Sequence, residues 1–245
     1  RDWRVDDEPG RPPLVVARGG DSASRVRAAV GALGGMERFV KRGETVLVKP
    51  NMAWDRTPEQ GANTDPQVVA EVVRLCRGAG ARRVIVAENP VHDAGRAAER
   101  SGIGAAVAAA GGELVLPGAS GFESMTLGGS VLATWDVLSV VFQADRLVNV
   151  PVVKHHSLSR LTCGLKNHMG LIGGTRGRLH QEIHPALVDL AAAFRPTLTV
   201  VDATRVMMRN GPTGGRLEDL APFDTVAACT DAVACDAWAA RQLGL

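Results

Sequence analysis

Residues 45–51 read TVLVKPN, residues 65–77 read DPQVVAEVVRLCR, and residues 83–90 read RVIVAENP. The first and last segments begin with a short apolar run rich in valine and isoleucine, which is typical of a buried strand. The middle segment begins with an acidic cap followed by proline, and glycine follows its last residue, as expected of a helix. The three segments predict a βαβ unit with parallel strands at 45–48 and 83–87 and a helix at 65–77.

Similar patterns on both sides extend this unit into an α/β domain: a mostly parallel twisted sheet with helices on both faces, in three layers. Residues 1–13, which are polar and rich in proline, are predicted to form an N-terminal arm. Residues 14–245 form a single α/β domain with an irregular insertion around 118–141. Further strands are predicted at 14–17, 114–116, 147–153, 197–202 and 225–229, and further helices at 21–32, 94–110 with a break at 101–102, 159–169, 185–194 and 231–243.

Composition excludes several classes of protein. The net charge is +2, 22% of the residues are charged and 45% are hydrophobic, so the chain is neither disordered nor basic enough to suggest a nucleic-acid partner. No apolar run reaches the roughly 18 residues of a membrane span. The four cysteines form no CxxC pair, which argues against an iron–sulfur cluster or a zinc ribbon within this chain.

Polar residues follow several predicted strands at the point where each strand ends. Because the carboxyl ends of parallel strands share one edge of a sheet, which is where α/β proteins bind ligands, we expect a pocket there. Ordinary loop polarity and helix capping are the alternative, and capping alone explains Asp65 and Asp231. Gly214 belongs to a glycine-rich run at 211–215 that either cradles an anion or is only a turn. The binding candidates are Lys49, Asn51, Glu88, Lys154, Asn167 and Gly214.

The predicted helix at 159–169 has an unusual polar face. Ser159, Thr162, Cys163 and Lys166 share the spacing i, i+3, i+4 and i+7, opposite a leucine stripe. This face carries no glutamate, so we expect it to face a ligand, although a solvated face is the alternative. Cys163 is a candidate nucleophile beside Lys166, and a buried structural thiol is the commoner arrangement.

Five of the six histidines lie within residues 154–184. Histidine serves as an acid or base near neutral pH and as a metal ligand. The catalytic candidates are His155, His156, Lys166 and Cys163. A divalent metal is a further possibility, with His168, His180 and His184 as ligands, but Pro185 opposes a helical arrangement of the last two. Anion binding is favoured over metal binding, with lysine and arginine donors at Lys49, Lys154, Lys166, Arg176 and Arg178.

Several motifs together resemble a known family. They are VKPN at 48–51, NTDP at 63–66, KHH at 154–156, TCGLKNHMG at 162–170, NGPTGG at 210–215 and TDAVA at 230–234. In combination they resemble the domain-of-unknown-function family numbered 362. The motifs follow the order of that family, and the resemblance runs from about residue 14 to residue 245. Some members carry an added ferredoxin-like domain, whose cysteines this chain lacks. Cys163 stands where the family often has a small residue, so thiol chemistry would not be general to the family.

The resemblance also bears on location and function. Many members with the GMERFV stretch at 35–40 look exported through a twin-arginine leader, which implies an exported protein, periplasmic or membrane-peripheral, with a processed start near Arg1. The family is also loosely similar to the nickel-pincer lactate racemases, which implies cofactor or carboxylate binding. We therefore expect a Lys/His pocket for a small anionic ligand or a metal-bearing cofactor, with acid/base chemistry if the protein is an enzyme. The alternative is a non-catalytic accessory subunit that docks on a larger assembly, for example a redox one, through the arm or the insertion.

Overall fold

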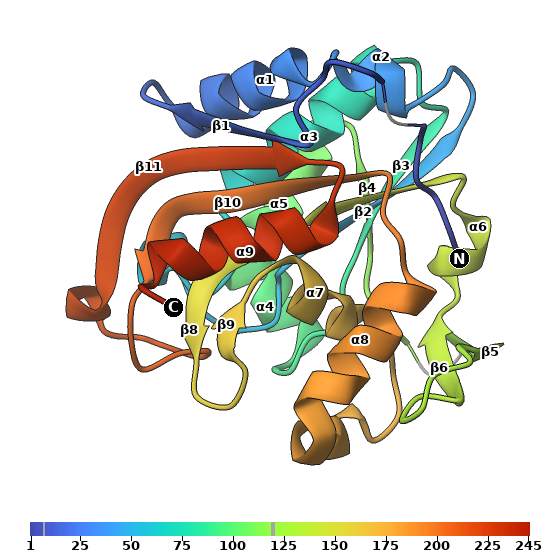
Figure 1. Ribbon diagram of the computed structural model, residues 1–245, viewed down its shortest axis with the longest axis vertical. Coiled ribbons are helices and arrows are strands. Elements are labelled where there is room, and N and C mark those ends of the chain that lie inside the picture. The colour runs from blue at the N-terminus through green and yellow to red at the C-terminus, as the bar shows by residue number, and fades with distance from the viewer. Residues whose placement is uncertain (7, 119–120) are drawn as a thin grey trace.

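The computed structural model describes residues 1–6, 8–118 and 121–245 and confirms the α/β fold with a mostly parallel sheet (Figure 1). Within the described residues, a nine-stranded sheet has the order β1-β11-β10-β7-β2-β3-β4, with β8 pairing β10 and β9. The strands from β10 to β4 run parallel, whereas β11 is antiparallel to both of its neighbours. The strands are β1 (Leu14–Arg18), β2 (Thr45–Pro50), β3 (Arg83–Ala87), β4 (Glu113–Val115), β7 (Arg146–Val150), β8 (Val152–His156), β9 (Arg160–Thr162), β10 (Leu198–Met207) and β11 (Leu220–Cys229).

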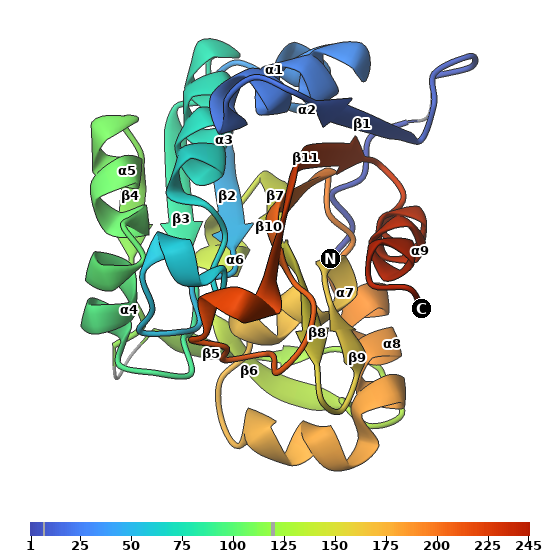
Figure 2. The same ribbon diagram turned by 90° about the vertical axis from the view of Figure 1, so that its left-hand side faces the viewer.

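Helices cover both faces of this sheet, so the domain has three layers (Figure 2). Alternation along β2 shows the division: Val46 and Val48 pack against one set of helices, and Leu47 packs against the other. One layer holds α1 (Ser22–Ala32), α2 (Met36–Phe39), α3 (Pro66–Gly78), α4 (Ala94–Arg100) and α5 (Ile103–Ala109). The opposite layer holds α6 (Val140–Gln143), α8 (Ile183–Ala193) and α9 (Ala232–Gln242).

The helix starts follow the sequence signals. Asp21, Asp65 and Asp231 each cap a helix by accepting hydrogen bonds from backbone N–H groups of its first turn. A cap satisfies N–H groups that have no partner within the helix, and this fixes where α1, α3 and α9 begin. The predicted break at 101–102 is also confirmed, since it separates α4 from α5.

Three predictions of local structure were wrong. The predicted strand at 147–153 is two strands, because Pro151 lacks the N–H group that a continuous ladder needs. The helix predicted at 159–169 is instead a turn, the strand β9 and a four-residue helix, α7 (Gly164–Asn167). Arg160 has a φ of 64°, which ends any helix, and β9 pairs antiparallel with β8 in a hairpin. Finally, α8 begins at Ile183 rather than at Pro185.

The N-terminal arm and the insertion are partly ordered. In the arm, Trp3 is buried and its indole Nε1 donates to the carbonyl oxygen of Ala144, because an apolar ring gains free energy by burial. In the insertion, β5 (Phe122–Thr126) and β6 (Thr134–Leu138) form a separate antiparallel hairpin. Residues 119–120 lie outside the described residues. A disulfide between Cys229 and Cys235 joins β11 to α9.

Candidate functional site

A cavity of about 350 Å³ lies where β2, β3 and β8 end, beside α7 and the short helix η3 (Arg176–Glu182). The four-residue helix α7 lies between β9 and α8 (Figure 1), and its residues Lys166 and Asn167 line the cavity. The ends of parallel strands thus supply one wall, as expected of α/β proteins. The polar lining comprises Asn51, Glu88, Asn89, Lys154, His156, Thr162, Lys166, Asn167, Arg176 and His180, and the apolar part includes Trp54, Pro90, Val91, Met169 and Pro212.

A buried ion pair forms the base of the cavity. Lys49 Nζ lies 2.7 Å from Glu88 Oε2 and 3.2 Å from Asn167 Oδ1, and both members of the pair are almost inaccessible to solvent. Asn167 Nδ2 donates to the carbonyl oxygen of Lys49 and to Asn149 Oδ1. Burial lowers the pKa of Lys49, and the nearby Glu88 charge opposes that effect. The negative charge of Glu88 is therefore balanced by Lys49 and adds little negative charge to the cavity.

Lys154 reaches the cavity from β8 and is fully buried. Its Nζ donates to Asn51 Oδ1 at 3.2 Å and to the carbonyl oxygen of Ala62, and it lies 5.8 Å from the centroid of the Trp54 ring. Burial and the neighbouring Lys166 lower the pKa of Lys154 to about 7. The amine is thus hydrogen-bonded to neutral oxygen atoms and partly deprotonated near neutral pH.

Lys166 comes from α7, and its Nζ lies 3.0 Å from Met169 Sδ and 3.5 Å from His180 Nε2. Burial and Arg176 lower its pKa to about 8. Arg176 bridges two segments of the chain by donating to the carbonyl oxygens of Met169 and Pro90. Among the described residues, no carboxylate oxygen lies within 4.0 Å of the amines of Lys154 and Lys166, so this part of the cavity is positively charged.

Two histidines complete the wall. The rings of His156 and His180 stack with centroids 5.7 Å apart. Burial, followed by the charge of Lys166, lowers the pKa of His156 to about 3 and also lowers that of His180. Both rings are therefore neutral at pH 7 and add hydrogen-bonding atoms rather than charge.

Several residues predicted for the site lie elsewhere. Side chains alternate along β8, so His155 turns away from the cavity and its Nδ1 accepts from the N–H group of Gly211. Cys163 is buried beside Asp236, and burial raises the pKa of its thiol well above the usual range, which opposes a nucleophilic role. Gly214 lies on the loop after β10, against Met207, and does not line the cavity.

The histidines predicted to bind a metal do not come together. His168 is fully buried and neither ring nitrogen has a hydrogen-bond partner, His180 lines the cavity, and His184 is exposed on α8. In the described part of the chain, no group of three or more histidine, cysteine, aspartate or glutamate side chains could hold a metal ion. The two amines and Arg176 also repel a cation. The donor set therefore does not fit a free divalent metal.

Two supporting residues were not predicted. Asn149 Nδ2 donates to the carbonyl oxygen of Gly164, and a buried asparagine within the apolar run 147–153 was a usable signal for it. Asp236 on α9 accepts hydrogen bonds from the N–H groups of Gly164 and Leu165, so it caps α7. Nothing local marks Asp236, because the N–H groups it accepts from lie 72 and 71 residues earlier in the chain.

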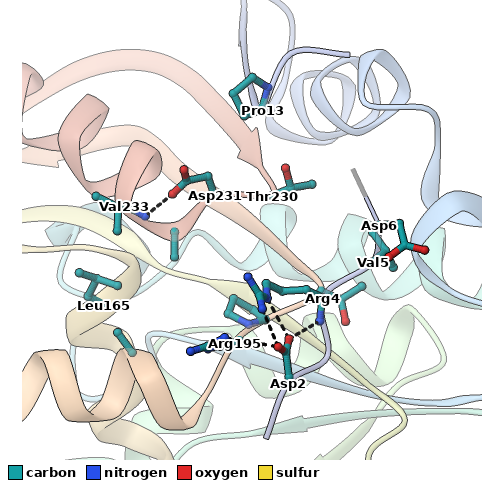
Figure 3. A pocket seen from close by; sticks show the side chains of 14 residues that line it. Asp2, Arg4, Val5, Asp6, Pro13, Leu165, Arg195, Thr230, Asp231 and Val233 are labelled. Atoms are coloured by element: carbon teal, nitrogen blue, oxygen red, sulfur yellow. Dashed lines mark hydrogen bonds and ion pairs between the residues drawn. The ribbon is translucent and has the colours of Figure 1, made fainter. Parts of the chain in front are cut away.

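A larger hollow of about 680 Å³ lies on the other side of α7, between the N-terminal arm, α8 and the start of α9 (Figure 3). Asp2 pairs with Arg4 and Arg195, and Asp231 caps α9 by accepting from the N–H groups of Val233 and Ala234. Unlike the smaller cavity, it brings together no buried amines. The smaller cavity is therefore the better candidate site.

Comparisons with known proteins identify a family and one curated relative. A family described as "Domain of unknown function (DUF362)" matches residues 46–241. The thylakoid-associated protein sll1697 of Synechocystis is 28% identical over 232 residues, which cover 89% of this chain and 68% of that protein. No helix within the described residues combines the length and apolar character needed to cross a membrane.

Two solved structures are more distant. The lactate racemase apoprotein from Thermoanaerobacterium thermosaccharolyticum is 14% identical with a TM-score of 0.43, and the match covers 82% of this chain and 53% of that protein. A protein from Thermotoga maritima is 11% identical with a TM-score of 0.49. That match covers 92% of this chain and 60% of the Thermotoga protein. The chain thus spans little more than half the length of these two proteins.

Proposed function

We propose, from the premise that the chain belongs to the DUF362 family, that the cavity beside α7 binds a small organic anion. The observation that carries this proposal is the pair of amines of Lys154 and Lys166, which line one cavity with Arg176 and have no carboxylate partner among the described residues. Buried charges without a partner are costly, and a bound anion would offset that cost.

The dimensions and lining of the cavity support a small ligand with an apolar part. Its volume of about 350 Å³ is near the lower end of the range for small-molecule sites. Trp54, Val91 and Met169 offer apolar contacts beside the charged groups. A carboxylate or phosphate on a small organic frame fits this combination better than an inorganic ion alone.

The metal-bearing cofactor offered as an alternative occupant has less support, since the three cationic side chains that line the cavity in the described part of the chain outnumber its one carboxylate there, that of Glu88. The accessory-subunit alternative required an occluded or empty pocket and a large exposed apolar patch. The open cavity and its amines favour a ligand instead.

An exported or membrane-peripheral location remains part of the proposal. The Cys229–Cys235 disulfide supports it, because disulfides persist mainly in oxidising compartments. The name of the thylakoid-associated relative is consistent with a peripheral position at a membrane.

Isothermal titration calorimetry of the full chain with oxalate and with phosphate tests the proposal. We expect binding by the wild type, and losses of roughly 10- to 100-fold in Lys154→Met and Lys166→Met, since a charge-assisted hydrogen bond contributes about 1.5–3 kcal/mol. Lys41→Met is the matched control, because Lys41 is exposed and distant from the lining. Absence of binding, or equal binding by all four proteins, would overturn the proposal.

A further inference from the structure

Lysine is scarce in this chain, and its distribution is uneven. The sequence contains 24 arginines but only four lysines, Lys41, Lys49, Lys154 and Lys166. Three of the four lie in or directly beneath the cavity. An arginine guanidinium stays charged in proteins, whereas a buried lysine can lose its proton and become a nucleophile. This distribution indicates that the site needs amines and not only positive charge.

Lys166 is the amine best placed to react. Lys49 forms an ion pair with Glu88, and Lys154 donates hydrogen bonds to two oxygen atoms. The nearest partners of Lys166 Nζ are a thioether sulfur at 3.0 Å and an imidazole nitrogen at 3.5 Å, which stabilise an ammonium ion only weakly. Lys166 is also only partly buried, so a ligand in the cavity can reach it.

The hydrogen bond of His180 assigns its tautomer. Nδ1 lies 3.0 Å from the carbonyl oxygen of Gly177, which can only accept, so Nδ1 carries the hydrogen. Nε2 is then an unprotonated acceptor that faces the amine of Lys166. An amine beside a base that is oriented by a third group is the usual arrangement around an activated nucleophile.

His156 has the opposite tautomer. Its Nδ1 accepts from the backbone N–H groups of Leu158 and Ser159 at 3.1 and 3.2 Å, so the hydrogen is on Nε2. His156 can therefore donate a hydrogen bond to a ligand oxygen. Thr162 lines the same cavity, and its Oγ1 is buried without a hydrogen-bond partner, so this side chain offers a second donor.

We propose that Lys166 forms a Schiff base with a small oxo acid, a molecule in which an aldehyde or ketone stands next to a carboxylate. The inference rests on the proposed function, since Lys154 and Arg176 would hold the carboxylate. Lys166 Nζ attacks the carbonyl carbon, His180 Nε2 accepts the proton from Nζ, and His156 and Thr162 face the carbonyl oxygen.

The reaction balances without any further reactant. Nζ attacks the carbonyl carbon, an N–C bond forms, and the C=O π pair moves to oxygen. The first proton from Nζ passes through His180 Nε2 to that oxygen and gives a carbinolamine. The C–O bond then breaks, the second Nζ proton leaves with the oxygen as one water molecule, and a neutral imine remains.

Reductive trapping tests the inference on the full chain. The protein is incubated at pH 7.5 with glyoxylate, and separately with 2-oxobutanoate, in the presence of sodium cyanoborohydride, and adducts are located by peptide mass spectrometry. We expect one adduct per chain at Lys166, formed roughly 100-fold faster than at exposed Lys41, because an ordinary lysine is almost entirely protonated at this pH.

Two variants separate the chemistry from the charge. Lys166→Arg keeps the positive charge and cannot form an imine, so it should abolish the adduct as fully as Lys166→Met while losing less affinity for oxalate. His180→Gln should slow trapping at Lys166 by at least about 100-fold, the lower end of what a positioned acid or base contributes.

The outcomes distinguish the two proposals. If the wild type binds oxalate but neither oxo acid labels Lys166 ahead of Lys41, the Schiff base is overturned and anion binding stands. If neither oxalate nor an oxo acid binds, both proposals fall.

Discussion

The imidazole rings of His156 and His180 lie almost parallel, with planes 10° apart and centroids 5.7 Å apart. One ring belongs to the end of β8, which pairs with β10 and β9, and the other belongs to η3, which contacts α8. Two imidazolium ions would repel each other and the amine of Lys166. The stack therefore requires neutral rings, in agreement with the lowered pKa values of both histidines.

Affinity for an anion should fall as the pH rises above 7. The pKa values of Lys154 and Lys166 are about 7 and about 8, so their positive charges disappear between pH 6.5 and pH 9 rather than near 10.5. Neutral histidines do not add charge in that window. Calorimetric titration with oxalate at pH 6.5, 8 and 9 should show a decline of roughly tenfold or more for the loss of one charge-assisted bond. Equal affinity at the three pH values would show that these amines do not hold the anion.

Breaking the buried ion pair should destabilise the protein strongly. Lys49→Met leaves the charge of Glu88 buried without a partner, and the cost is about 3–5 kcal/mol of unfolding free energy. The double variant Lys49→Met/Glu88→Met should recover much of that loss, because no unpaired charge remains. The exposed pair of Arg216 and Glu218 is the control, and Glu218→Gln should cost less than about 1 kcal/mol. Urea denaturation of these three variants and of the single variant Glu88→Met checks this prediction, and additive losses in the double variant would contradict it.

Gly170 should not tolerate a side chain. A Cβ atom there would overlap Glu88 Oε1 and lie 2.8 Å from Lys49 Cε, both in the buried base of the cavity. Gly170→Ala should therefore cost about 1–3 kcal/mol through overpacking and should weaken oxalate binding by displacing Glu88. Gly31→Ala is the control, since that helical position has open space around it and alanine favours a helix. A Gly170→Ala protein with wild-type melting temperature and oxalate affinity would disprove the close contact.

Asp236 should affect ligand binding without touching the cavity. Its carboxylate accepts from the N–H groups of Gly164 and Leu165 at 2.7 and 3.2 Å and fixes the start of the helix that carries Lys166 and Asn167. Asp236→Ala should cost about 1 kcal/mol of stability, as for other lost helix caps. Oxalate affinity should fall several-fold as well, because Lys166 is less well positioned. Asp231→Ala, which removes the cap of α9 itself, is the matched control: a similar stability loss with unchanged affinity would distinguish positioning from general destabilisation.

Much of the fold follows from local signals in the sequence. The strand at 83–87 and the capped helices after Asp21, Asp65 and Asp231 lie where the sequence placed them. Strand and helix formation at these points depends on neighbouring residues, on apolar runs and on side chains that cap nearby N–H groups. The polar residues after β2 and β3 were also apparent, since a βαβ unit brings both strand ends to one edge.

The tertiary structure alone decided the composition of the site. The spacing of Ser159, Thr162, Cys163 and Lys166 fitted a helix, but pairing of β9 with β8 formed a hairpin there instead. That pairing, and the alternation along β8, decided that Lys154 and His156 face the cavity and that His155 does not. Lys49 meets Asn167 across 118 residues of sequence, and His180 reaches Lys166 from a different helix. Local sequence determines which segments can become strands and helices, whereas side chains distant in the chain meet only when the whole sheet has buried its apolar faces.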